Sequence, residues 1–175
     1  MNDGAKYETT ENSIELRIRA GSFAQVPSIS LQSKTFTLAF WAKGLYHKSI
    51  HPLFGDWPSN ERANFLFLLE NRRLKFMRHA ADDTFEHVSS TSLNEGTYTH
   101  VAVTWTANKV TTFINGMKTE TIPAADKFFE GVANTGDWFD IGRSYERKMD
   151  GYIFELYLMN EVLSEEQIYK LAFKG

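Results

Sequence analysis

The amino-acid sequence predicts an all-β fold: a two-sheet antiparallel jelly-roll β-sandwich that ends in a short C-terminal helix. Many short apolar runs are separated by Gly, Pro, Asn and Ser turn signals, as in two-sheet antiparallel proteins. The run 152–159 is apolar at both alternating sets of positions, and only Glu155 interrupts it, so it has no solvent face and belongs inside a layered structure. Ser164 and Gln167 have the spacing of a capping box, and Ile168 begins the apolar stripe of a helix.

The other strands follow from hydrophobic alternation and from turn residues. Residues 14–18 alternate apolar and charged side chains, which is typical of a half-buried antiparallel strand. Residues 35–43 are apolar at nearly every position and predict a central strand. Asn115-Gly116 predicts a type I′ hairpin, because both central residues of that turn need positive φ. Further strands are expected at 23–26, 52–55, 64–70, 72–78, 85–89, 98–105, 110–114, 117–122 and 138–142.

Side chains in these strands predict the core. Trp41 and Trp105 lie within apolar strands and are assigned to it. Trp105 and Phe154 are expected to face the inside of the sandwich, so that replacing either by Ala would cost about 3–5 kcal/mol. Strict alternation along the closing strand puts Tyr152, Phe154, Leu156 and Leu158 on one face and Ile153, Tyr157 and Met159 on the other.

Length and composition limit the function classes. The 175 residues suit one domain, with a flexible N-terminal arm at 1–11 and the sandwich at 12–175. A net charge of −3 argues against nucleic acid. No apolar run approaches the roughly 20 residues that span a bilayer, so no membrane insertion is expected. Residues 1–13 are polar, and we expect no signal peptide in them. The absence of cysteine excludes disulfides, thiolate catalysis and Cys-based zinc sites.

Four blocks of the sequence resemble laminin-G-like domains of the concanavalin A-like lectin/glucanase superfamily. One block runs from His100 to Gly116, and the others contain Trp41, the Ile-Gly pair at 141–142 and the closing segment. Together they cover about residues 35–171. Pentraxins share some of these features, but their usual core disulfide is impossible here. The closing segment matches the family pattern at Gly151, Ile153, Glu155, Asn160, Leu163, Ser164 and Ile168, whereas Phe154 stands where the family usually has Asp.

The resemblance implies a non-catalytic binding domain, with carbohydrate recognition as the first expectation and a glycan or glycoprotein as the partner. The alternative left open is a protein–protein adhesion module of a larger extracellular or surface protein. The family favours an extracellular or cell-surface location, and the oligomeric state is left open. No enzyme is expected, because the Glu-x-Asp-x-x-Glu run that pairs two carboxylates on one strand face in the glucanase branch is absent.

Two groups of residues have the composition of a sugar site, in which aromatic rings pack on apolar sugar faces and polar groups bind hydroxyls. One group lies in the irregular segment 44–63 and the other around the strand 138–142, and we expect both to line one groove. The alternative is that the two tryptophans only cap the core and that loop 143–148 is merely solvated. The predicted ligand-binding residues are Asp56, Trp57, Asn60, Arg62, Trp138, Arg143 and Tyr145.

No cofactor is expected, although the resemblance leaves calcium open. The family Asp is Phe154 here, which favours solvated loop acids over a metal site. A zinc site at His47 and His51 is not expected, because Pro52 disfavours the helix that would bring them together. If calcium binds, the oxygen ligands would come from Asp56, Asn60, Asp137, Asp140 and Asp150.

Overall fold

A computed structural model gives the arrangement of most of the chain. It describes residues 5–9, 14–18, 23–27, 35–44, 50–56, 65–80, 83–106, 108–123, 138–144 and 147–173. Within those ranges, no helix has the length and apolar character needed to cross a membrane.

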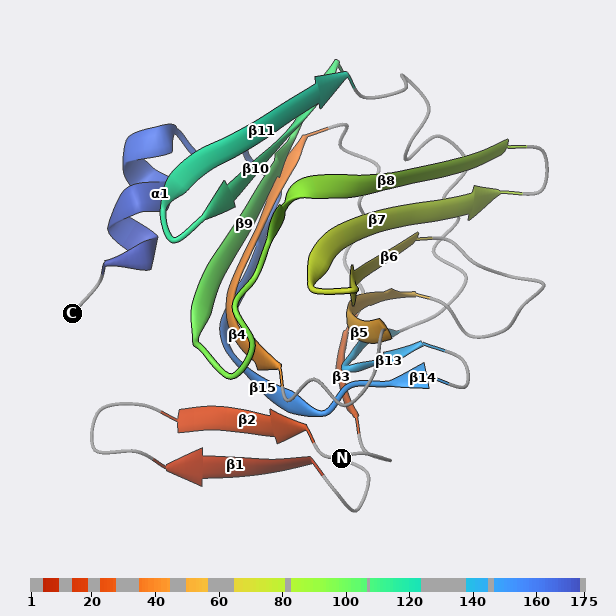
Figure 1. Ribbon diagram of the computed structural model, residues 1–175, viewed down its shortest axis with the longest axis vertical. Coiled ribbons are helices and arrows are strands. Elements are labelled where there is room, and N and C mark those ends of the chain that lie inside the picture. Colours follow the sequence, from red (N-terminus) through yellow and green to blue (C-terminus); the bar gives the residue numbers. More distant parts are fainter. Residues whose placement is uncertain are drawn as a thin grey trace.

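Two antiparallel sheets face each other and form the predicted sandwich (Figure 1). The seven-stranded sheet has the order β1 (Ala5–Thr9), β2 (Ile14–Ile18), β15 (Gly151–Met159), β4 (Phe36–Gly44), β9 (Thr99–Trp105), β10 (Lys109–Ile114) and β11 (Met117–Pro123). The six-stranded sheet has the order β3 (Ala24–Pro27), β12 (Trp138–Ile141), β5 (Ile50–Asp56), β6 (Phe65–Glu70), β7 (Arg73–Ala80) and β8 (Asp83–Ser92). A small hairpin of β13 (Arg143–Ser144) and β14 (Arg147–Lys148) contacts β5, and α1 (Glu165–Ala172) is the C-terminal helix. The predicted fold class is confirmed.

The N-terminal strand differs from the prediction. Residues 5–9, assigned above to a flexible arm, form β1 and pair with β2 from Ala5↔Ile18 to Thr9↔Ile14. Pairing satisfies backbone N–H and C=O groups that β2 would otherwise expose at the edge of the sheet. The segment was missed because it is mostly polar, and a strand held mainly by backbone hydrogen bonds leaves little hydrophobic signal.

The core lies between the sheets and consists mainly of phenylalanine and leucine. Trp105 is 2% exposed and stacks on Phe36, with ring centroids 5.8 Å apart and planes 11° from parallel. Its predicted core position is therefore confirmed. The largest fully buried side chains are Phe36, Phe40, Phe54, Phe65, Phe67, Phe76, Leu38, Leu53, Leu69 and Leu74.

A β-bulge in β15 changes which side chains point inward. The register with β4 shifts between Phe154 and Tyr157, and Glu155 has φ 48°. Before the bulge Ile153 belongs to the core; after it Leu156 and Leu158 pack against the same core. An extra residue in one strand breaks the period-two pattern, so the strict alternation predicted for this strand is wrong.

Because of the bulge, Phe154 lies on the outer face of the seven-stranded sheet instead of in the core. It stacks on Trp41 of β4, with ring centroids 5.8 Å apart and planes 10° from parallel. Both rings are half-buried. The predicted core positions of Trp41 and Phe154 are therefore wrong: an apolar strand can carry large rings on its outer face when they pack on each other across strands.

Helix α1 covers the other half of that outer face. The predicted capping box is confirmed: Gln167 N donates to Ser164 Oγ at 3.2 Å, and Ser164 N donates to Gln167 Oε1 at 2.8 Å. Leu163 and Ile168 form a second apolar cluster with Ala39, Ala102 and Phe113 on the sheet beneath them. The helix therefore packs where small alanines leave room for it.

Candidate functional site

The predicted site begins where β5 and β12 lie side by side. Asp140 pairs with Gly55 and Ile141 with Phe54 in antiparallel register. Asp56 ends β5 and Trp138 begins β12, so the backbone brings both residues to the same end of this strand pair. Asp56 is buried. Segments far apart in the sequence therefore lie side by side within the six-stranded sheet.

Arg143, one of the predicted binding residues, is held here by Asp140 and Phe23, and Asp140 is held in turn by Gln25. The Nε and one terminal nitrogen of Arg143 each donate to Asp140 Oδ2 at 2.8 Å. Gln25 Nε2 donates to the other oxygen, Asp140 Oδ1, at 2.9 Å. The guanidinium carbon of Arg143 lies 3.4 Å from the ring centroid of Phe23. Since the Arg143 side chain is still 29% exposed, a rigid guanidinium with further N–H donors faces solvent.

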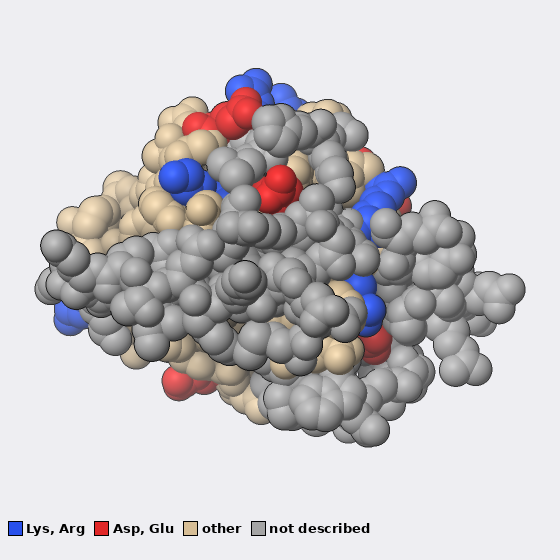
Figure 2. All heavy atoms as spheres, turned by 90° about the horizontal axis from the view of Figure 1, so that it is seen from below, with Lys and Arg blue, Asp and Glu red and all other residues tan. Residues whose placement is uncertain are grey.

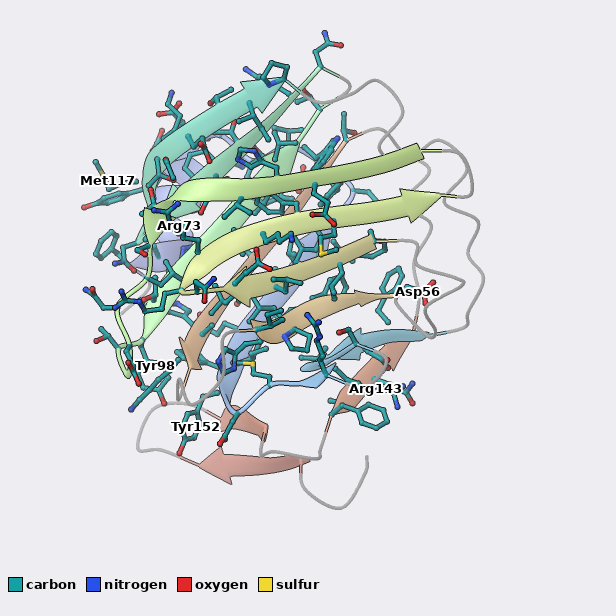
Figure 3. All side chains as sticks on the ribbon, turned by 45° about the vertical axis from the view of Figure 1, so that its right-hand side comes forward. Asp56, Arg73, Tyr98, Met117, Arg143 and Tyr152 are labelled. Carbon is teal, nitrogen blue, oxygen red and sulfur yellow. The ribbon has the colours of Figure 1, made fainter. Side chains whose placement is uncertain are left out.

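The described members of the predicted site are Asp56, Arg143 and the backbone of Trp138. Trp57, Asn60, Arg62 and Tyr145 lie outside the described residues, as do Asp137 and His47, and Trp138 is described by its backbone alone. Figure 3 shows Asp56 and Arg143 on one side of the molecule, away from Tyr98 and Tyr152.

Sequence reasoning missed Phe23 and Gln25. Both belong to a segment that was expected only to form a short strand, and Gln25 lies 115 positions from its partner Asp140. No pattern within a short stretch of sequence predicts the pairing of Gln25 with Asp140.

The neighbours of Asp140 bear on the calcium alternative. Both of its carboxylate oxygens accept hydrogen bonds from protein donors, and one of those donors is the Arg143 cation. A guanidinium at hydrogen-bond distance repels a metal ion and leaves less of the carboxylate for coordination. Among the described residues, no group of three His, Cys, Asp or Glu side chains could hold a metal ion. Asp140 therefore acts here as the anchor of Arg143.

A second group of residues, which sequence reasoning did not assign to a site, lies on the outer face of the seven-stranded sheet. Tyr152 pairs with Lys43 and Phe154 with Trp41 in the register of β15 and β4. Tyr98 contacts Phe154 edge to face at 5.4 Å and lies 6.2 Å from Tyr152. We call these residues the aromatic face: Trp41, Lys43, Tyr98, Tyr152 and Phe154, all half-buried.

His100 lies against the aromatic face and is buried. Its ring meets Trp41 edge to face at 5.4 Å, and no described residue bonds to its Nδ1. Burial lowers the pKa of His100 from 6.5 to about 4, so the imidazole is neutral in the folded protein at neutral pH.

This lowered pKa predicts a specific loss of stability in acid. Between pH 6.5 and about 4 the unfolded chain protonates His100 more readily than the folded protein does, so stability falls as the pH drops below about 6.5 and the loss levels off below about 4. The difference in pKa corresponds to about 3 kcal/mol. We expect His100→Gln to lose less stability than the parent between pH 7 and pH 4, as measured by urea unfolding. Equal losses in parent and variant would contradict this assignment.

An ion-pair cluster lies on the outer face of the six-stranded sheet, where β6, β7 and β8 run side by side. Lys75 lies 3.4 Å from Glu70 and 3.1 Å from Glu86. Burial lowers the pKa of Lys75, but its two carboxylate partners raise it by more. In the view from below, the described Lys and Arg residues are interspersed with Asp and Glu (Figure 2).

A family model of the laminin G type, described as the concanavalin A-like lectin/glucanases superfamily, matches residues 19–169. The chain belongs to this superfamily. Members of the concanavalin A-like lectin/glucanase superfamily share the two-sheet sandwich seen here, and the resemblance drawn from four sequence blocks is confirmed. No curated protein sequence matches this member of the superfamily.

Solved structures share its fold at low sequence identity. Domain 4 of AbnA, an extracellular arabinanase from Geobacillus stearothermophilus, in complex with arabinotriose, has a TM-score of 0.77 and 18% identity, covering 98% of this chain and 82% of that chain. The binding domain of botulinum neurotoxin DC, in complex with rat synaptotagmin II, has a TM-score of 0.73 and 12% identity, covering 97% of this chain. A structure of botulinum neurotoxin type C has a TM-score of 0.72 and 14% identity; cell entry of this toxin depends on interaction with two ganglioside molecules. This chain spans only 44% of either neurotoxin chain.

Proposed function

We propose that this protein is a non-catalytic carbohydrate-binding domain that recognises a glycan or glycoprotein at the β5–β12 strand pair. The observation that carries the proposal is the fixed position of Arg143, held between the Asp140 carboxylate and the Phe23 ring while part of the guanidinium stays exposed. A donor that is already ordered loses little conformational entropy when a sugar hydroxyl binds to it.

The residues proposed for this site suit a sugar. The proposed site comprises Asp56, Trp57, Asn60, Arg62, Trp138, Arg143 and Tyr145. Asp56 and Trp138 lie at one end of the paired strands, residues 57–62 follow directly on Asp56 in the chain, and Arg143 follows the other end of β12. Two tryptophan rings supply stacking surfaces, and the other members supply donors and acceptors for hydroxyls.

The structural relatives support the choice of ligand class. The AbnA domain is in complex with arabinotriose, and the neurotoxin type C structure concerns interaction with gangliosides. Affinity for a single sugar unit is expected to be weak, on the order of millimolar, because each stacking contact and hydrogen bond contributes little. Tighter binding requires several sugar units or several copies of the domain. An extracellular or cell-surface location fits such a ligand.

The proposal is tested with a glycan array, run with and without chelator. Calorimetry then measures the affinity for the selected glycan and for arabinotriose. We expect Arg143→Lys to weaken binding by about tenfold, since lysine lacks the planar fork that engages Asp140 and keeps the donors in place. Trp57→Ala and Trp138→Ala should weaken binding by a similar factor, because each removes a stacking ring worth about 1 kcal/mol or more.

The matched control is Arg147→Lys, which makes the same change at an exposed position of the neighbouring strand β14. It should bind like the parent. All variants are first compared with the parent by thermal melting. If Arg143→Lys and both tryptophan variants are folded and bind every selected glycan as the parent does, the site assignment is wrong.

A protein-binding role is the second candidate, and one exposed cluster favours it. Met117, Tyr169 and Phe173 are 62%, 48% and 59% exposed, and the rings of Tyr169 and Phe173 lie 4.6 Å apart. Aromatic and methionine side chains are enriched in protein interfaces. The neurotoxin DC relative is in complex with synaptotagmin. Phe173→Ser should weaken binding to a protein partner and leave glycan binding intact.

A further inference from the structure

The aromatic face departs from what a solvent-facing sheet normally presents. Antiparallel strands usually place polar side chains on the face that meets water. Here the outward positions are instead aromatic: Tyr152 and Phe154 on β15, Trp41 on β4, and Tyr98 just before β9. All four rings are half-buried. On the same face, the positions beneath α1 are filled by small residues such as Ala39 and Ala102. The large rings therefore occupy the part of this face that α1 does not cover.

The bulge at Glu155 creates this arrangement. Without the register shift between Phe154 and Tyr157, strict alternation would place either Ile153 or the pair Leu156 and Leu158 outside the core. With it, β15 fills the core along its whole length and still presents Tyr152 and Phe154 outward. The positive φ of Glu155 raises the conformational energy of the folded chain at this position, which is next to the aromatic face.

A cation lies among the rings. The Lys43 ammonium is 4.9 Å from the ring centroid of Tyr98 and 5.7 Å from that of Tyr152. The tyrosine rings hold the ammonium by cation–π attraction and shield part of it from water. An anionic group that approaches this position gains a charge-assisted hydrogen bond in surroundings less polar than bulk solvent.

We infer that the aromatic face is a second ligand-binding surface, separate from the β5–β12 strand pair, that takes a saccharide bearing a carboxylate or sulfate group. The rings pack against the apolar faces of the sugar units, and the Lys43 ammonium binds the acidic group. A second copy of this chain is a poor occupant, because a two-fold interface centred on this face would bring two Lys43 ammoniums together among apolar rings. Tyr98 and Tyr152 lie on the side of the molecule away from Asp56 and Arg143, so the two surfaces share no described residue (Figure 3).

Calorimetry and amide NMR shifts with three tetrasaccharide probes test this inference: galacturonic acid tetramer, a sulfated chondroitin tetramer and neutral galactose tetramer. We expect at least one acidic probe to bind more tightly than the neutral one and to shift the amides of residues 41–43, 98–100 and 152–154. Binding should weaken as salt is raised. Lys43→Gln, which keeps a polar chain but removes the charge, should reduce the affinity for the acidic probe at least tenfold. Tyr98→Leu should reduce the affinity for all probes that bind this face.

Lys109→Gln is the matched control, since it removes a lysine charge from an exposed position of β10 and should bind like the parent. The acidic probes are also titrated into Arg143→Lys, so that failure at the β5–β12 strand pair and failure at the aromatic face are seen separately. The inference is overturned if neither acidic probe binds more tightly than the neutral one, if Lys43→Gln binds like the parent, or if the amide shifts cluster around 140–143. An oligoglutamate peptide that binds as tightly as the acidic saccharides, or a dimer in sedimentation that Tyr98→Leu abolishes, would also overturn it.

Discussion

Replacing Trp105 with Ala is expected to lower the free energy of unfolding by about 3–5 kcal/mol, because the change removes a large ring from a closely packed core. Trp105 is 2% exposed and stacks on Phe36 at the start of β4. The space left behind lies between two sheets that cannot close around it without shifting every strand. In a domain of this size the loss corresponds to a fall in melting temperature of roughly 10 °C.

Phe154→Ala provides the comparison. This ring is half-buried on the outer face and packs mainly on Trp41 and Tyr98, so its removal should cost only about 1 kcal/mol. Urea unfolding of both variants measures the difference. Equal losses for Trp105→Ala and Phe154→Ala would contradict the outward position of Phe154 and, with it, the bulge in β15.

The features that the sequence predicts correctly are those encoded within a few neighbouring residues. The Asn115-Gly116 turn has φ 49° and 75°, as its type I′ signal requires. The Ser164 capping box depends on side chains three positions apart. The sandwich itself follows from many short apolar strands, and the family resemblance from motifs of similar length. In each case the pattern and its structural consequence lie in the same short segment.

The features that could not be predicted depend on how one segment meets another. The sequence around Glu155 does not predict a bulge, because the position of the extra residue is set by the pairing with the partner strand β4. That single shift decides whether Phe154 belongs to the core or to the aromatic face. At the candidate site, Arg143 was recognised from composition, but its anchors Asp140, Gln25 and Phe23 become evident only once β3, β12 and β13 are assembled. Predicting a residue's type of chemistry is therefore easier than predicting its partners.

Gly55→Ala is expected to destabilise the protein by about 3 kcal/mol or more, which is at the upper end of the cost of overpacking. A Cβ at position 55 would lie 2.9 Å from the Leu66 Cα of the neighbouring strand and closer still to the carbonyl oxygen of Phe65. Both are backbone atoms of β6, so no side-chain rotation relieves the contact. The irregular register of β5 between Pro52 and Phe54 accompanies this close approach.

Gly96→Ala is the control that separates the steric clash at position 55 from the stability cost of replacing a glycine as such. Gly96 has φ 67° but nothing within 4 Å of its added Cβ, so the variant bears only the left-handed backbone penalty of about 1–2 kcal/mol. The same change at position 55 should cost clearly more in urea unfolding. Gly55 also precedes Asp56 and pairs with Asp140, so any outward shift of β5 moves the anchor of Arg143. If Gly55→Ala folds at all, its glycan binding should therefore weaken together with its stability, whereas Gly96→Ala should bind like the parent. A Gly55→Ala protein as stable as the parent would contradict the close packing of β5 on β6.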